Sequence, residues 1–483
     1  MVESTDPKYD QTLAYIKEAF YSSYLDGLKE TVRIPSLNPD YDPEWLINRS
    51  LFKQMDHMAN FARQQDIKGC AVHPLSEGER TPFLIVTVEA SEGYKGENCV
   101  LMYGHMDKQP FGEGWKHDPC DPVIENGKMN GRGSSDDGYS IYSALLAIKA
   151  CQVNGLSHPR VVVTIEANEE GGTEEDLIHY MSTYKSTLIG EPNVVFCLDS
   201  DAFSEDTLVI SSSLRGCVIF DLKVTAFKEN LHSGYSGIVP DPHHIGISLI
   251  SRIFDFSKQT MIQDFHVEIP PHRIDECKLA ADKLPSMLKM LPVNDTLKSI
   301  AHDQGELEKY HLIANSTWLP QLTITGLEGL PNNLADASNS IKRQITFRCS
   351  MRLPPTLTAE KAKALLQKHL IDHPNQQRDT YGAQVELSYF GDNGFDTKAL
   401  DEGVQKAFFD ANKYVFNGNV PIFVGCGGSI PFMEMFSTMF PKANFLLTGV
   451  GFPDSNAHAA NENLDLEFCR KLISTVALTL SKL

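Results

Sequence analysis

Acidic and imidazole side chains stand at the ends of three apolar segments of this 483-residue sequence. They are His105, Asp107, Glu169, Glu170 and Asp199. Histidine nitrogens mixed with carboxylate oxygens form a ligand set that suits zinc, with manganese or cobalt as alternatives. Such a set indicates a cation site that leaves an open position for water.

His105 and Asp107 are two residues apart at the end of the apolar run Val100–Tyr103. In an extended chain this spacing places both side chains on one face. An aspartate beside an imidazole can accept its second N–H and so turn the other ring nitrogen toward a metal ion. Taken alone, the pair is more typical of a structural or surface histidine.

Glu169 and Glu170 follow the apolar run Val161–Ile165, and as neighbours they must point in different directions. One can therefore bind a cation while the other handles a proton. Taken alone, a Glu-Glu pair is typical of a solvated helix start. The stronger indication is positional, because open α/β sheets bind ligands at the carboxyl ends of their strands.

Two polar loops add candidate ligands. The loop Gly131–Gly138 lacks the Gly-Lys-Ser/Thr ending of a phosphate-binding loop, so we interpret Asp136 as a carboxylate that bridges two cations. The alternative is a helix N-cap, a role that Asp137 also suits. The loop Gly451–Glu462 offers His458, which completes a set of two imidazoles and three carboxylates.

The apolar segments are expected to be strands of one mainly parallel sheet, because they alternate with helical patterns. Strands are predicted at 83–88, 100–103, 161–165, 194–198, 422–424 and 445–448. Helices are predicted at 11–32, 139–153, 400–414 and 466–480.

A block of different texture interrupts this alternation. Its elements are predicted at 218–224, 242–256, 322–325, 341–353, 359–371 and 385–390. Their order, β-α-β-β-α-β, is that of a ferredoxin-like α+β domain. We therefore expect an α/β domain made of residues 1–213 and 393–483, with residues 214–392 inserted in it. Residues 258–320 form a long insertion to which no structure is assigned.

The charge and cysteine pattern restrict the partners and the compartment. The chain has 63 acidic and 43 basic residues, and its net charge of -20 does not suit nucleic acid or an anionic membrane. The ten cysteines form no Cys-x-x-Cys pair, the first ten residues lack a secretory signal, and no apolar run is long enough to span a membrane. We expect a cytoplasmic protein with reduced thiols.

Ordered motifs along nearly the whole chain resemble those of the dizinc metallopeptidase family of carnosinases, cytosolic nonspecific dipeptidases, aminoacylases and glutamate carboxypeptidases. The matching segments are Gly104–Asp107, Gly131–Asp136, Glu169–Glu170, Asp199, Leu231–Gly234, Arg352, Gly427–Pro431 and Ala457–Glu462. The resemblance implies a zinc-exopeptidase-like α/β catalytic domain split around an inserted lid that also serves dimerisation.

The resemblance further implies two divalent cations per subunit, zinc first, with manganese or cobalt as alternatives. His105 and Asp199 would hold one ion, and Glu170 and His458 the other. Asp136 would bridge the two.

Catalytic roles follow from the same resemblance. Asp107 would orient His105, and Glu169 would act as the general base that takes a proton from water and passes it to the leaving amine. His232 would reach across a homodimer to stabilise the tetrahedral oxyanion in the partner's site.

Substrate contacts are implied at the carboxylate end of a peptide. Arg352 would grip a free C-terminal carboxylate with two parallel hydrogen bonds, and Gly428, Ser429 and His458 would add contacts. Asn339 stands where relatives use a threonine to contact substrate. This departure leaves the specificity for the amino-terminal residue open.

The expected activity is hydrolysis of dipeptides or short peptides that have a free C-terminal carboxylate. The main alternative is an N-acyl-amino-acid hydrolase of the aminoacylase or desuccinylase type, which would use the same metals. A catalytically silent binding protein is a second alternative, against which the complete ligand set argues. A two-metal phosphoesterase is a third, against which the missing basic phosphate clamp argues.

Overall fold

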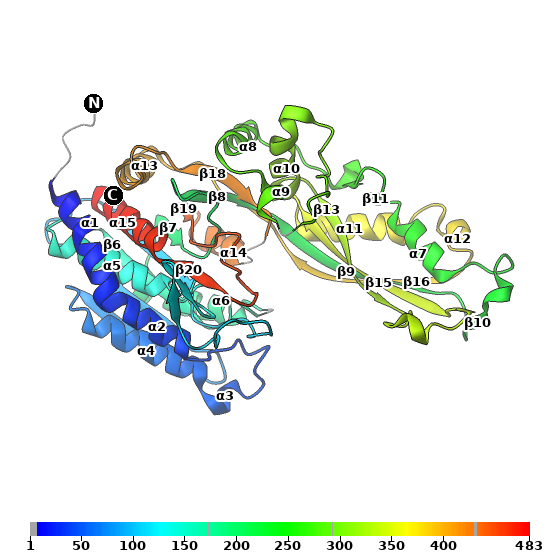
Figure 1. The fold of residues 1–483 in the computed structure, drawn as a ribbon, viewed down its shortest axis with the longest axis horizontal. Coiled ribbons are helices and arrows are strands. Elements are labelled where there is room, and N and C mark those ends of the chain that lie inside the picture. Colours follow the sequence, from blue (N-terminus) through cyan, green and yellow to red (C-terminus); the bar gives the residue numbers. More distant parts are fainter. Residues whose placement is uncertain (1–6, 172, 292, 429–431) are drawn as a thin grey trace. The chain divides into compact units, whose positions relative to one another are not determined.

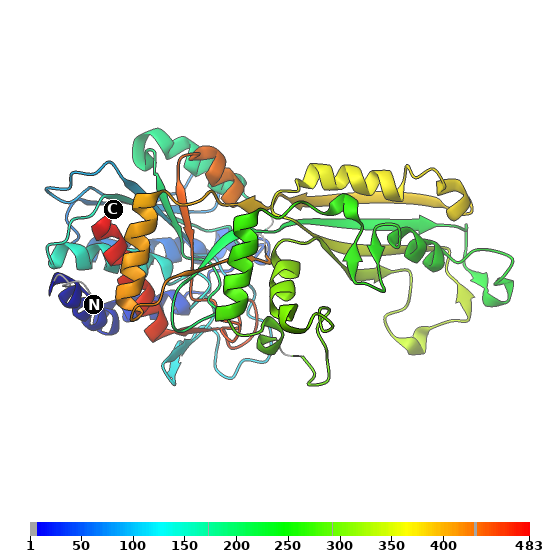
Figure 2. The same cartoon turned by 90° about the horizontal axis from the view of Figure 1, so that it is seen from above.

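The computed structural model describes residues 7–171, 173–291, 293–428 and 432–483. The chain forms two compact units, of which unit 1 comprises Met1–Ser211, Thr397–Phe423 and Met435–Leu483. Unit 2 comprises Ser212–Asp396 and Val424–Glu434. Figures 1 and 2 show the elements of both units.

Among the described residues, unit 1 is built around a six-stranded sheet with the order β1-β2-β6-β3-β7-β19. The strands are β1 (Cys70–Leu75), β2 (Phe83–Val88), β3 (Cys99–His105), β6 (Arg160–Glu166), β7 (Val194–Cys197) and β19 (Asn444–Leu447). Neighbours from β6 to β19 are parallel, whereas β2 is antiparallel to both β1 and β6. The predicted α/β class with a mainly parallel sheet is thus confirmed.

Helices cover both faces of this sheet. On one face α5 packs against β3 and β6, and α1 and α15 pack against α5. On the other face Tyr180 of α6 stacks on Phe83, and Phe436 of α14 meets Tyr103 edge to face. The helices are α1 (Pro7–Ala19), α2 (Leu25–Arg33), α3 (Trp45–Asn48), α4 (Ser50–Gln64), α5 (Ser140–Val153), α6 (Glu175–Tyr184), α13 (Glu402–Val415), α14 (Phe432–Met439) and α15 (Leu466–Lys482). Strands buried on both sides read as continuous apolar runs, which is why the sequence revealed them.

The strands that precede the polar residues are direct neighbours in the sheet. β3 pairs with β6 on one side and with β7 on the other, so that Val100 lies opposite both Val161 and Val194. Because the three strands are parallel, their carboxyl ends lie at the same edge of the sheet. The polar residues that follow them converge there.

Short strands hold the loops of unit 1. β4 (Val123–Glu125), β5 (Lys128–Asn130) and β20 (Asn463–Asp465) form a three-stranded sheet in the order β20-β5-β4. Another short sheet is not confined to unit 1 and has the order β17-β8-β18. β17 (Phe395–Asp396) belongs to unit 2, and β8 (Val209–Leu214) and β18 (Ile422–Cys426) each include residues of both units.

Unit 2 contains an antiparallel sheet in the order β13-β15-β9-β16. Its strands are β9 (Gly216–Thr225), β13 (Gln321–Glu328), β15 (Gln344–Leu353) and β16 (Gln384–Asp392). The inward-facing residues of β9, from Val218 to Val224, pack against α7 (Pro242–Ile250) and α11 (Ala359–Leu370). The predicted β-α-β-β-α-β order is present, and the sheet order is that of a ferredoxin-like domain.

Some boundaries differ from the prediction. Helix α7 ends at Ile250, not at 256, because the chain turns there into the short pair β11 (Phe254–Asp255) and β12 (Thr260–Met261). The unassigned insertion contains α8 (Pro271–Lys283), α9 (Met287–Met290) and α10 (Glu308–Thr317), and α8 packs against α10. Helix α5 begins at Ser140 without a side-chain cap, so Asp137 does not serve as its N-cap.

Candidate metal centre

Two imidazoles face the two oxygens of one carboxylate in unit 1. His105 Nε2 lies 3.1 Å from Asp136 Oδ1, and His458 Nε2 lies 2.9 Å from Asp136 Oδ2. His105 Nε2 also lies 3.8 Å from Asp199 Oδ2, while His458 Nε2 lies 3.2 Å from Glu170 Oε2. Asp136 therefore stands between two groups of side chains that could each hold a cation.

Two overlapping groups have the spacing that one ion requires. One ligand atom from each of His105, Asp136 and Glu170 lies within 4.8 Å of the others, and the same holds for His105, Glu169 and Asp199. His105 and Glu170 are buried, whereas the side chain of His458 is 58% exposed. The five ligands predicted from the sequence and Glu169 are brought together, and distance alone does not separate Glu169 from the ligands.

The electrostatics of the centre favour bound cations. Burial raises the pKa of Asp199 to about 7, and the charge of Asp136 adds to the rise. Burial also raises the pKa of Glu169 well above its usual range, with Asp199 as the next cause. Asp136 and Glu170 raise the pKa of His458 to about 11. Crowded buried carboxylates are stabilised when they bind metal ions, so these residues fit a pair of divalent cations.

Asp107 joins the loops that follow β3 and β6. Its carboxylate accepts hydrogen bonds from the backbone N–H of Glu169 (3.2 Å) and of Glu170 (2.9 Å). His105 Nδ1 lies 3.1 Å from the backbone carbonyl oxygen of Asp107 and 3.5 Å from its carboxylate. Asp107 therefore meets the imidazole mainly through its backbone oxygen, while its side chain positions the two glutamates.

Two residues that the sequence did not single out support this arrangement. Asn38 Nδ2 donates to Asp107 Oδ2 at 2.7 Å, and Gln109 Nε2 donates to Glu170 Oε2 at 2.7 Å. Gln109 lies two residues after Asp107, so the same alternation that selected Asp107 could have selected it. Asn38 follows α2 in an irregular segment that offers no such pattern.

Two of the other candidates lie together on a short ribbon of unit 2. β10 (Leu231–His232) pairs with β14 (Ser340–Ile341), so that His232 lies opposite Ser340. Ser233 Oγ donates to Asn339 Oδ1 at 2.6 Å, which places Asn339 beside the segment of His232.

Arg352 and Gly428 lie elsewhere in unit 2. Arg352 is half-buried on β15 and pairs in register with Cys217 of β9. The Gly428 carbonyl accepts a hydrogen bond from the backbone N–H of Arg215 at 3.1 Å. Ser429 lies outside the described residues.

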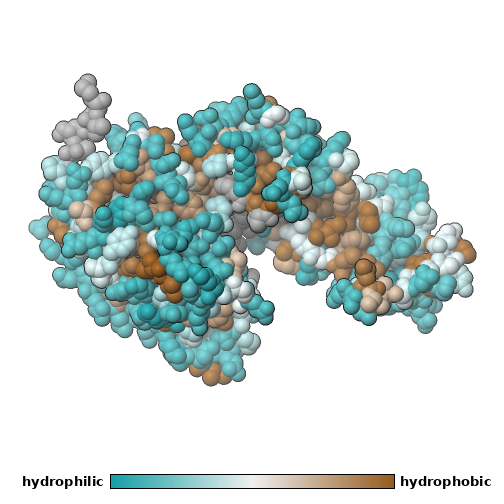
Figure 3. Space-filling model, viewed as in Figure 1, coloured by the Kyte–Doolittle hydropathy of each residue, from teal (hydrophilic) through white to brown (hydrophobic). Residues whose placement is uncertain are grey.

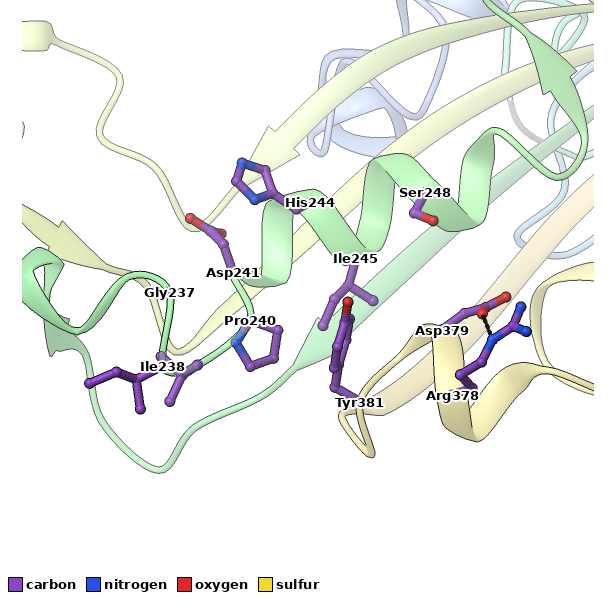
Figure 4. Close-up of a pocket in the computed structure, with 11 residues that line it drawn as sticks. Gly237, Ile238, Pro240, Asp241, His244, Ile245, Ser248, Arg378, Asp379 and Tyr381 are labelled. Carbon is purple, nitrogen blue, oxygen red and sulfur yellow. Dashed lines mark hydrogen bonds and ion pairs between the residues drawn. The ribbon is translucent and has the colours of Figure 1, made fainter.

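A surface hollow of about 600 Å³ lies in unit 2 beside the start of α7 (Figure 4). The segment Gly237–Asp241 borders it, and Tyr381 stands next to Ile245. Arg378 and Asp379 form an ion pair at 2.8 Å there. Figure 3 shows apolar side chains among polar ones on this face of unit 2.

None of the helices in the described ranges has an apolar stretch of membrane-spanning length.

Comparison with known proteins extends these observations. Residues 101–482 match the peptidase family M20/M25/M40. The chain is 27% identical over 376 residues to the cysteinylglycine-S-conjugate dipeptidase of Corynebacterium striatum, covering 76% of this chain and 77% of that protein. It is 25% identical over 467 residues to a Cys-Gly metallodipeptidase of Candida albicans, covering 93% and 92%.

The fold also has close counterparts among solved structures. The crystal structure of human carnosine dipeptidase 1 aligns with a TM-score of 0.76 and 21% identity, covering 99% of both chains. Because the family match spans most of the chain and includes the segments that carry the metal centre, the chain belongs to the peptidase family M20/M25/M40.

Proposed function

We propose that this chain is a metal-dependent dipeptidase that removes the N-terminal residue from dipeptides or short peptides bearing a free C-terminal carboxylate. The observation that carries the proposal is the position of Asp136, each of whose oxygens faces a different imidazole. A carboxylate in that position suits the bridge of a two-cation centre. Peptidase membership and the dipeptidase names of the similar proteins supply the substrate class.

The proposed centre holds two divalent cations, zinc in preference to manganese or cobalt. His105 and Asp199 belong to one ion and Glu170 and His458 to the other, with Asp136 shared. When bound, the ions supply positive charge that acidifies a water molecule and polarises the scissile carbonyl.

Glu169 is the proposed general base. The half-buried carboxylate of Glu169 lies beside the proposed ligands. Its backbone N–H donates a hydrogen bond to the Asp107 carboxylate. Burial raises its pKa, which strengthens the carboxylate as the acceptor of a proton from water. Gln109 Nε2 donates to Glu170 Oε2 at 2.7 Å. This contact fixes the carboxylate of Glu170, which supports Glu170 as the ligand and Glu169 as the base.

Unit 2 supplies the proposed contacts to the substrate carboxylate. Arg352 would bind that group in bidentate fashion. Gly428 and Ser429 would add contacts to the same group. Asn339 and His458 are further proposed contacts to the substrate, without assignment to its carboxylate.

The proposed assembly is a homodimer in which residues 214–392 form the lid and dimerisation domain. His232 would act in the partner's site. Exposed apolar side chains near its ribbon support a protein contact there, since Ile238 is 78% and Leu334 90% exposed. A cytoplasmic location is proposed as well, because all ten cysteines are free thiols.

A substrate panel tests the function. The purified chain, stripped of metal and reconstituted with zinc, manganese or cobalt, should hydrolyse dipeptides faster than N-acetyl or N-succinyl amino acids. Amidated dipeptides should be poor substrates, because they lack the carboxylate that Arg352 would bind. Turnover confined to the acylated substrates would instead assign an N-acyl-amino-acid hydrolase.

A further inference from the structure

The Glu462 carboxylate is fully buried in unit 1 and accepts hydrogen bonds from several neighbouring groups. Its Oε1 accepts hydrogen bonds from the backbone N–H of Ser135 (3.0 Å) and of Asp136 (3.2 Å). Its Oε2 accepts from the backbone N–H of Gly133 (3.1 Å) and from Arg132 Nη1 (2.9 Å). One side chain thus holds the whole loop that ends on Asp136.

The same residue closes the loop that carries His458. Glu462 directly precedes β20, which pairs with β5, and its carbonyl accepts from the backbone N–H of Gly131 at 2.9 Å. The loop before it contains three non-glycine residues in the left-handed region, Asn456 (φ 55°), His458 (φ 61°) and Asn461 (φ 65°). Such conformations are uncommon for residues with a Cβ, asparagine being the main exception, so the conformation of His458 depends on the contacts that hold the loop.

Arg132 is the charged partner of the Glu462 carboxylate. Its side chain is 2% exposed, donates to the Pro110 carbonyl at 3.0 Å and lies over the Trp115 ring at 5.3 Å. Burial raises the pKa of Glu462, and Arg132 with the surrounding N–H donors opposes that rise. Loss of either partner would leave a buried charge without its counter-ion, which is costly.

We infer that Glu462 and Arg132 are positioning residues that set the separation of Asp136 from His458, and so control binding of the cation assigned to His458 and Glu170. This inference rests on the proposed two-metal function. Neither side chain is a ligand in that proposal. Their effect passes through the two loops that they join.

Glu462→Gln is the sharpest test. Glutamine keeps the size of the side chain, but its NH2 group would point a donor at N–H donors of residues 132–136. We expect the affinity for one of the two zinc ions to fall by about 10- to 100-fold. This is the usual effect of removing a residue that hydrogen-bonds to a metal ligand or to its loop. Calorimetric titration of the metal-free protein and metal analysis after dialysis measure this. The matched control is Glu467→Gln, whose ion pair with Arg470 lies on the more exposed surface of α15.

Three outcomes separate the explanations. Wild-type protein that binds fewer than two ions would overturn the two-metal proposal itself. Wild type and Glu462→Gln that both bind two ions with equal affinity would overturn the inference alone. If metal-free Glu462→Gln has a much lower melting temperature than metal-free wild type but the same zinc affinities, Glu462 has a structural role only, and the inference is wrong. If Glu462→Gln does not fold, Arg132→Lys replaces it, since it retains the charge but not the planar guanidinium, and the same comparison applies.

Discussion

At the residue scale, two adjacent carboxylates of the centre differ in the contacts that they make, and this difference assigns them different roles. Glu169 and Glu170 are adjacent, and both donate their backbone N–H to Asp107. Glu170 additionally receives a hydrogen bond from Gln109, and His458 lies 3.2 Å from its carboxylate. These contacts favour Glu170 as a ligand and leave Glu169 for proton transfer.

Replacement of Glu169 tests this division. Glu169→Gln should lower kcat by about 100- to 10,000-fold, because an amide cannot accept the proton from water. Its zinc content should remain that of wild type, measured by metal analysis of the dialysed protein. Glu170→Gln is the matched control and should lose zinc. Loss of zinc from Glu169→Gln to the same extent would make Glu169 a ligand.

The pH dependence of zinc affinity is a second prediction. In the metal-free protein Asp199 has a pKa of about 7, so it carries a proton below that pH. Zinc binding requires the ionised form and must displace this proton. Affinity should therefore rise as the pH increases from 6 to 8, with proton release visible as a dependence of the calorimetric heat on the buffer's ionisation enthalpy. Constant affinity and heat over this range would contradict the prediction.

At the scale of elements, parallel strands bring the ligands to one edge and a buried amine fixes the loop beside them. Lys108 follows Asp107, is 1% exposed, and its Nζ donates to the carbonyls of Thr31 (2.7 Å), Val32 (3.1 Å) and Ile34 (2.7 Å). These carbonyls belong to the end of α2, where a helix leaves its last carbonyls without intrahelical partners. The ammonium therefore ties the end of α2 to the loop after β3.

Lys108→Met removes this connection while preserving the side-chain length. The three carbonyls would lose their donor, which should lower the free energy of unfolding by about 3 kcal/mol. Urea unfolding of the metal-free protein measures the change. Lys149→Met is the control, because that amine contacts only the exposed Asp66, through its carbonyl at 2.6 Å and its carboxylate at 3.8 Å, and its loss should cost less than about 1 kcal/mol. Equal costs for both variants would show that Lys108 does not stabilise α2.

At the scale of the whole molecule, the proposed homodimer has active sites to which both subunits supply residues. His232 belongs to unit 2 and Glu169 to unit 1. If His232 completes the partner's site, each active site contains Glu169 of one subunit and His232 of the other. A defect in one residue could then be complemented by a subunit defective in the other.

Mixing two inactive variants measures this complementation. His232→Ala and Glu169→Gln, unfolded together and refolded, should form mixed dimers with one complete site each. With random assortment, about half of the dimers are mixed, so activity should return to about a quarter of the wild-type value. Each variant refolded alone is the control. No recovery from the mixture, despite mixed dimers shown by mass spectrometry, would place His232 and Glu169 of one subunit in the same site.

The sequence predicted those elements whose signals are local. The run 83–88 became β2 without change of boundary, and β3, β6 and β7 lie within two residues of their predicted ends. Their continuous apolar character follows from burial on both faces. α4 and β1 were not identified. β1 has no buried residue and so no apolar run, whereas the buried residues of α4 recur at helical spacing and could have revealed it.

Local patterns along the chain indicate which residue types end the strands and in what order the motifs follow, which was enough to predict the fold class and the candidate ligands. The pairing of each Asp136 oxygen with one imidazole, and the hydrogen bonds from the Asp136 loop to Glu462, arise from long-range packing. Glu462 and Arg132 are 330 positions apart in the chain. Hydrogen bonds over such separations depend on the packing of β20 against β5, and no local spacing encodes them.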